Sequence, residues 1–184
     1  MQLGKVIPLF KQQKPRTVLH VLDTYWNALP QQDGVPSRSD LDPRGMHGAL
    51  DHILLLDHIG QGNAQIRVAG QKWAKTFKTD LIGLPLSVLF APEARPQLAQ
   101  IILDLVDLPA KVSFSMESLG GKARGHDLGH VTFFPLRDGM GHVSQGIGVL
   151  SPVGSLAQKT DKTILTAYHK QIISAVNFSE TLKK

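Results

Sequence analysis

The feature that most constrains the fold is a pair of strand-like runs joined by a tight turn between residues 52 and 69. The first run is continuously apolar over 53–56, and the second alternates through Ile66 and Val68. Gly60, Gly62 and Asn63 lie between them. Turn-forming residues between two such runs are typical of an antiparallel hairpin. We therefore predict strands near 52–58 and 64–69 that open a sheet.

Helical patterns follow the hairpin. Residues 71–78 place Trp73 and Phe77 on one helical face, and 84–90 predict another short helical piece. The clearest helix covers 93–107, where apolar residues recur at i, i+3, i+4 and i+7. Pro96 falls in its first turn, where the missing N–H costs little, and Pro109 ends it.

Three more strands are predicted after these helices. Residues 111–119 alternate between apolar and polar side chains, so one face of this strand should be buried. Residues 126–137 and 142–150 flank Asp138-Gly139, a strong hairpin signal. The pattern predicts an α+β fold: a five-stranded antiparallel sheet with helices on one face, two strands before the helices and three after.

Flanking helices are predicted at both ends of this sheet domain. Thr17 can cap an amphipathic helix that runs to Leu29, where Pro30 stops it, and the stretch 30–45 has the composition of a loop. After Pro152, helically spaced apolar residues predict a second helix from Asp161 to Val176. Residues 1–16 are predicted to be a flexible basic leader, 17–152 the domain, and 153–184 a C-terminal helical extension.

The stretch from 42 to 90 resembles a known family. The resemblance is carried by Asp42-Pro43 and by the segments 54–57, 67–70 and 80–83. These are similar to the bacterial family of small, largely stand-alone PAS domains (the PAS_5 type), in which a Trp, here Trp26, ends the preceding helix. The resemblance covers roughly 17–152 and implies a sensory domain with the same order of strands and helices. The chain departs from the family at Lys78, where a glycine is usual, and at Leu84, where a basic residue is usual.

The resemblance implies a ligand pocket between the sheet and the short helices. Its side chains would be Trp73, Phe77, Leu86, Phe90, Phe114, Met116 and Phe134. Aromatic and methionine side chains at such positions equally suit a filled core, so both interpretations stay open.

Absent residue types narrow the cofactor chemistry. The chain has no cysteine, which excludes disulfides, thiolate metal sites and the flavin-adduct or thioester-chromophore modes of PAS sensors. It has no histidine between His58 and His126, which disfavours haem. On a strand, His126 and His130 would lie about 13 Å apart, too far to share a zinc ion easily. We expect no cofactor and no metal.

Catalytic chemistry is also not indicated. Asp51-His52 and Asp57-His58 could be parts of acid–base pairs, but no serine or cysteine nucleophile context accompanies them. We interpret these histidines as surface residues, and we do not expect an enzyme.

The net positive charge of the chain does not by itself decide which class of partner it binds. The net charge of +5 and the pI of about 9.6 permit an acidic partner, and Lys72, Lys75 and Lys78 would share a helix face. A solvated face explains these lysines, whereas nucleic-acid binding has no supporting motif. No secretory signal and no apolar run of membrane-spanning length are present, so we expect a soluble, cytoplasmic protein.

The combined expectation is a PAS-type signalling or regulatory protein. It would bind a small ligand non-covalently in its core, dock a partner protein, or do both; the alternative is a ligand-free interaction or dimerisation adaptor. We predict a homodimer built on the N-terminal helix, with Val18, Leu22, Tyr25 and Trp26 at its centre.

Overall fold

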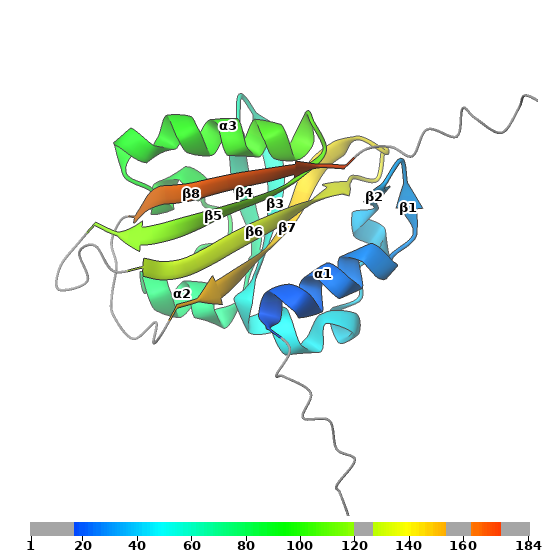
Figure 1. The fold of residues 1–184 in the computed structure, drawn as a ribbon, viewed down its shortest axis with the longest axis horizontal. Helices are drawn as coiled ribbons and strands as arrows, with labels where there is room; N and C mark the ends of the chain where they lie inside the picture. Colours follow the sequence, from blue (N-terminus) through cyan, green and yellow to red (C-terminus); the bar gives the residue numbers. More distant parts are fainter. Residues whose placement is uncertain (1–16, 120–126, 154–162, 174–184) are drawn as a thin grey trace, which may run out of the picture.

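A six-stranded antiparallel sheet forms the centre of the computed structural model, which describes residues 17–119, 127–153 and 163–173 (Figure 1). The strands follow the order β4-β3-β7-β6-β5-β8 across the sheet. Their bounds are β3 Ile53–Gly60, β4 Asn63–Ala69, β5 Ala110–Ser118, β6 Asp127–Arg137, β7 Val143–Pro152 and β8 Thr163–Ile172. The first five occupy the positions that the sequence predicts.

The sixth strand, β8, is a correction, because the sequence predicts a helix over 161–176. Residues 163–172 pair instead with β5, antiparallel, at the edge of the sheet. A bulge at Ala167, whose φ is +49°, lets Leu165 and Tyr168 face the same side although they are three residues apart. Apolar residues three positions apart on one side are also typical of a helix, which is why the sequence pattern predicts one here. Asp161 and Val176 lie outside the described residues.

The predicted N-terminal and central helices are confirmed. Their bounds are α1 Val18–Ala28, α2 Gln71–Phe77 and α3 Arg95–Val106, with 3₁₀ segments η1 Arg38–Asp40, η2 Pro43–His52, η3 Leu86–Leu89 and η4 Pro92–Ala94. The stretch predicted to be a loop contains a small hairpin, β1 Gln31–Gln32 and β2 Val35–Pro36. Asp33 and Gly34 form its turn with positive φ values of 49° and 77°.

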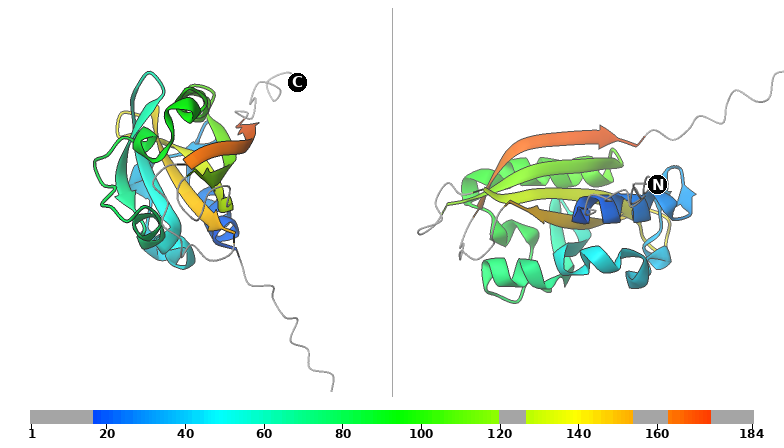
Figure 2. Two further views of the ribbon diagram at one scale, coloured as in Figure 1. Left: turned by 90° about the vertical axis from the view of Figure 1, so that its left-hand side faces the viewer. Right: turned by 60° about the horizontal axis from the view of Figure 1, so that its bottom comes forward.

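Helices cover both faces of the sheet, whereas the sequence predicts one covered face. We call the face under α2 and α3 the inner face, and the face under α1 and η2 the outer face (Figure 2). Along β3, Leu54 and Leu56 belong to the inner cluster, and Ile53 and Leu55 to the outer one. The continuous apolar run in this strand therefore reflects burial on two sides.

Helix α1 buries its apolar side chains in its own chain. Thr17 caps it by accepting a hydrogen bond from the His20 backbone N–H at 3.2 Å. Leu22 is fully buried, and the buried Trp26 donates its indole N–H to the Pro135 carbonyl at 3.0 Å. Leu22 and Trp26 therefore do not lie on a surface that a second chain could contact, contrary to the predicted interface. Val18 and Tyr25 are half-buried, and the homodimer stays a prediction.

A buried carboxylate fastens β8 to α3. Asp104, 2% exposed, accepts hydrogen bonds from Tyr168, Lys170 and, within α3, Gln100. Burial by itself would raise the pKa of Asp104, but the hydrogen bonds from these three side chains outweigh it and hold that pKa below its ordinary value. Burial, together with the Asp104 carboxylate, raises the pKa of Tyr168.

The other edge strand, β4, is covered by the chain that follows α2. Ile66 donates its backbone N–H to Leu84 and accepts one from Gly83. In the described part of the chain, no helix is both long and apolar enough to cross a membrane.

Candidate functional site

The predicted core pocket is largely a packed cluster. Six of its seven side chains lie together on the inner face and are at most 7% exposed: Trp73, Phe77, Leu86, Phe90, Phe114 and Met116. Trp73 stacks on Phe77 with ring centroids 6.4 Å apart, and Phe90 meets Phe114 edge-on at 6.2 Å. Phe134 lies in the outer cluster on the opposite face, so the prediction that it joins the other six is wrong.

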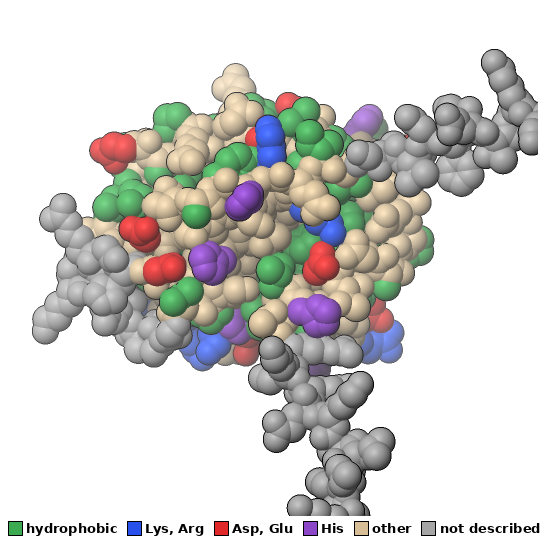
Figure 3. Space-filling view, viewed as in Figure 1, with side chains coloured by type: hydrophobic (Ala, Val, Ile, Leu, Met, Phe, Trp, Pro, Cys, Tyr) green, Lys and Arg blue, Asp and Glu red, His purple; other side chains and the backbone are tan. Residues whose placement is uncertain are grey.

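A cleft of about 510 Å³ opens instead on the outer face, between α1 and β8. It is lined by Thr17, Leu19, His20 and Asp23 from α1 and its cap, by Lys111, Ser113, Thr132 and Phe134 from β5 and β6, and by His169, Lys170 and Gln171 from β8. Figure 3 shows histidine side chains spread over this side of the molecule among polar and apolar atoms. The N-terminal helix and the C-terminal strand thus meet at one hollow.

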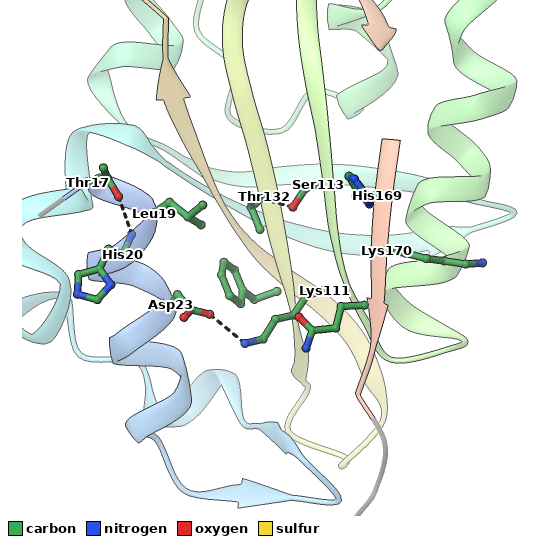
Figure 4. Close-up of a pocket in the computed structure, with 11 residues that line it drawn as sticks. Thr17, Leu19, His20, Asp23, Lys111, Ser113, Thr132, His169 and Lys170 are labelled. Carbon is green, nitrogen blue, oxygen red and sulfur yellow. Dashed lines mark hydrogen bonds and ion pairs between the residues drawn. The ribbon is translucent and has the colours of Figure 1, made fainter. Parts of the chain in front are cut away.

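Lys111 of β5 links the sheet to α1 inside this cleft. Its ammonium group lies 2.9 Å from the Asp23 carboxylate on α1 (Figure 4). It also lies 3.2 Å from the Asn27 side-chain oxygen on the same helix. The same ammonium lies over the Trp26 and Phe134 rings, 4.6 Å and 5.1 Å from their centroids. Its side chain is 17% exposed. Because Asp23 and Lys111 are 88 positions apart, no local sequence pattern could pair them.

The rest of the cleft is rich in hydrogen-bonding groups. The Ser113 and Thr132 hydroxyls lie 3.0 Å apart on neighbouring strands. His20 and His169 are exposed at the two sides, and Figure 4 shows Lys170 pointing away, towards α3. Such a lining suits a polar molecule with both donors and acceptors.

One histidine on the outer face has a serine partner. His130 Nδ1 lies 2.7 Å from the Ser115 hydroxyl oxygen. This contact has the geometry of a base and a nucleophile, but the hydroxyl belongs to a residue that is only 6% exposed. Within the described ranges, no carboxylate is hydrogen-bonded to His130. The pair is therefore accounted for as a cross-strand contact between β5 and β6.

The described residues show no metal-binding cluster. His126, the other member of the predicted histidine pair, lies outside the described residues. Among the residues that the structure does describe, no group of three or more His, Cys, Asp or Glu is arranged to hold a metal ion.

A second hollow on the outer face, of about 260 Å³, lies between η1, η2 and strands β3, β4 and β7. We call it the apolar groove, and it is lined by Arg38, Leu41, Pro43, Met46, Leu50, Ile53, Leu55, Val68 and Ile147. Beside it, Asp57 on β3 pairs with both Arg38 and Arg67, and it also accepts a hydrogen bond from Gln145. The sequence analysis considered Asp57 only with its neighbour His58 and missed this cluster.

The histidines interpreted as surface residues are half-buried. His52 Nδ1 lies 2.8 Å from the Leu150 carbonyl oxygen, and its own carbonyl accepts the indole N–H of Trp73. His58 Nε2 is buried, and it has no hydrogen-bond partner among the described residues. Both residues lie at β3, where burial on two faces leaves little exposed surface.

Comparison with known proteins places most of this architecture in one family. The sequence profile of the PAS domain matches residues 14–151, well over half of the chain, and β8 lies beyond the match. No curated protein matches the chain. The match includes α1, the five strands predicted from the sequence and the helices between them. The chain belongs to the PAS domain family, which suggests a signalling or sensory role.

Proposed function

We propose that the protein is a regulatory PAS module that binds a small polar ligand non-covalently in the outer cleft. Binding would change the position of a flanking element, and a partner protein would recognise that change. One observation carries the proposal: the cleft is lined by both flanking elements, α1 and β8, and Lys111 on the sheet holds α1 through Asp23. A ligand in this hollow would contact the two elements through which a small domain can reach another protein.

The outer cleft suits a ligand better than the inner face does. On the inner face, the side chains proposed as a pocket pack against one another, as the contacts of Trp73 with Phe77 and of Phe90 with Phe114 illustrate. On the outer face, the polar residues Ser113, Thr132 and Lys111 line an open cleft. A polar ligand recovers there the hydrogen bonds that it loses on leaving water.

The binding signal would reach α1 because the ligand competes with residues of α1 for the Lys111 ammonium group. A ligand oxygen that reaches its ammonium group competes with the Asp23 carboxylate and the Asn27 side chain, so binding loosens the contact between α1 and β5. The ligand shifts the position of α1 only if it binds the loosened state more tightly than the closed one. A ligand with a hydrogen-bond acceptor would bind the loosened state more tightly, because it takes the place of Asp23 as the acceptor for Lys111.

The test is to search for the ligand and then remove Lys111. Native mass spectrometry of the purified protein, with thermal denaturation against a collection of small polar metabolites, should find a compound that raises the melting temperature. The Lys111→Met variant keeps the aliphatic stem and loses the charge, so its response to that compound should disappear. Lys75→Met, an exposed change on α2, should leave the response intact.

The adaptor remains the second candidate, and the packed inner face favours it. If no compound binds the wild-type protein, or if Lys111→Met responds as the wild type does, ligand sensing at this cleft is wrong. A PAS module that acts by contact alone would then be the better account.

A further inference from the structure

The apolar groove combines an unusual pair of properties: an apolar lining and an uncompensated positive charge at one side. It shares no lining residue with the outer cleft, so it is a separate site. Its floor is made of buried side chains such as Met46, Ile53 and Ile147, which are at most 5% exposed. Its sides include Leu50 and Val68, which are 37% and 46% exposed.

The charge beside the groove follows from a simple count. Two guanidinium groups, those of Arg38 and Arg67, share one carboxylate, that of Asp57, which leaves one positive charge (two minus one). Asp57 Oδ1 accepts from Arg38 at 3.2 Å and from the Gln145 amide at 2.7 Å, while Oδ2 accepts from Arg67 at 2.5 Å. The Asp57 contact uses a single nitrogen of Arg38, and a guanidinium carries five N–H donors.

Arg38 is placed to present those donors to a ligand. It belongs to η1, its side chain is 37% exposed, and it lines the groove directly. The Asp57 carboxylate fixes the guanidinium on one side and leaves its other edge for a second carboxylate. Arginine and carboxylate form strong, charge-assisted and often bidentate hydrogen bonds.

The exposed apolar side chains supply the second half of the recognition. A molecule lying in the groove would cover Leu50 and Val68, and the removal of their apolar surface from water favours binding. A purely polar anion would lose this contribution, and a neutral apolar molecule would leave Arg38 without a new partner.

We propose that the apolar groove binds a small carboxylate with an apolar body, with the carboxylate on Arg38 and the body against Met46, Leu50 and Val68. The volume of about 260 Å³ suits a medium-length acyl chain or a single aromatic ring with a short side chain. The proposal does not depend on the ligand of the outer cleft.

Octanoate and 3-phenylpropanoate are the probes. Their binding to the full chain is measured by calorimetry and by methyl NMR. Each tests one source of the same chemistry, an acyl or an aromatic acid. At least one should bind and shift the methyl signals of Leu50, Val68 and Ile147. 1-Octanol, which has the same chain without the charge, should bind about tenfold or more weakly, because it cannot form the ionic hydrogen bonds.

Two variants locate the site. Arg38→Gln should weaken the bound acid about tenfold or more. Val68→Thr keeps the side-chain shape and replaces one methyl group with a hydroxyl on a half-exposed residue, so it should weaken binding severalfold with little effect on folding. The control is Arg44→Gln, whose side chain is 91% exposed and, among the described residues, forms an ion pair only with Asp42. This variant should bind like the wild type.

Four results would overturn the proposal. Neither acid binds the folded protein; octanol binds as well as octanoate; Arg38→Gln, with an unchanged melting temperature, binds like the wild type; or the shifted methyls lie at the outer cleft. If neither acid binds and the Val68→Thr change alters the oligomeric state in light scattering, the groove is covered by a second copy of the chain instead.

Discussion

Lys78 shows how a single residue can depart from the family pattern at a cost to the fold. It ends α2 with φ 51° and ψ 38°, the left-handed conformation that glycine adopts most easily. The resemblance described above predicts a glycine here, and glycine would adopt these backbone angles without strain. The sequence identified the departure, but only the structure connects it to backbone strain.

Replacing Lys78 with glycine should therefore stabilise the protein. The Lys78→Gly change relieves the left-handed strain of about 1 kcal/mol, partly offset by the greater freedom of glycine in the unfolded chain. We expect the free energy of unfolding to rise by about 0.5 kcal/mol, measured by urea denaturation. Lys75→Gly is the matched control, because Lys75 is an exposed residue inside α2, and there the change should cost about 1 kcal/mol. A loss of stability in both variants would show that strain at Lys78 is negligible.

At the scale of elements, local pattern predicted almost everything that repeats regularly. The alternation in β5 and the apolar spacing of α3 each have one period, and the Asp138-Gly139 pair is a local turn signal, so each of the three has one interpretation. The strand β8 was wrongly predicted to be a helix, because the bulge at Ala167 changes the period inside the strand. Its β-branched residues, Thr163, Ile164 and Thr166, were the signal that could have indicated a strand.

The docking of β8 on α3 should make stability depend on pH through Asp104. Its pKa is lowered in the fold, so the unfolded chain binds more protons in acid. The contribution of Asp104 is therefore complete above its ordinary value near 4 and is lost as the pH falls through the lower folded value. Tyr168 behaves oppositely: its pKa is raised, so its contribution is present below pH 10 and is lost at higher pH.

The measurement is chemical denaturation of variants across the pH range. Asp104→Asn should cost about 1–3 kcal/mol at neutral pH, because hydrogen bonds to a charged group are lost, and it should flatten the acid limb. Tyr168→Phe should flatten the alkaline limb. Asp107→Asn, an exposed change at the end of α3, should leave both limbs as in the wild type. If Asp104→Asn loses stability in acid as steeply as the wild type, Asp104 does not couple β8 to pH.

For the whole molecule, the sequence predicted the order of the elements but not how the sheet is enclosed. Covering of both faces could not be deduced, because Leu22 and Trp26 would be equally apolar in a dimer interface or against their own sheet. The outer cleft also could not be predicted from the sequence, because its lining residues are as far apart in the chain as Asp23, Lys111 and His169. Such sites depend on which elements meet, and local periodicity carries no information about that.

The last prediction concerns β8 as the strand that closes the sheet beyond the matched domain. Several contacts hold its inner side. The Thr163 hydroxyl donates to the Leu89 carbonyl at 2.9 Å, Leu165 is 8% exposed in the inner cluster, and both Tyr168 and Lys170 bond Asp104. A variant with Thr163→Ala, Leu165→Ala and Tyr168→Phe should release β8. The Leu165→Ala change alone is worth about 2–5 kcal/mol in a well-packed core.

Release of β8 would leave β5 as an open edge with unpaired backbone groups, which promotes association between chains. Hydrogen exchange should therefore accelerate at the β5 amides that point towards β8 and stay slow in β3 and β7, while light scattering detects larger species. The control carries three alanines on the opposite side of the same strand, Thr166→Ala, His169→Ala and Gln171→Ala, and should behave like the wild type. Slow exchange of those β5 amides in the inner-side variant would instead mean that backbone pairing and the remaining Lys170–Asp104 contact are enough to hold β8.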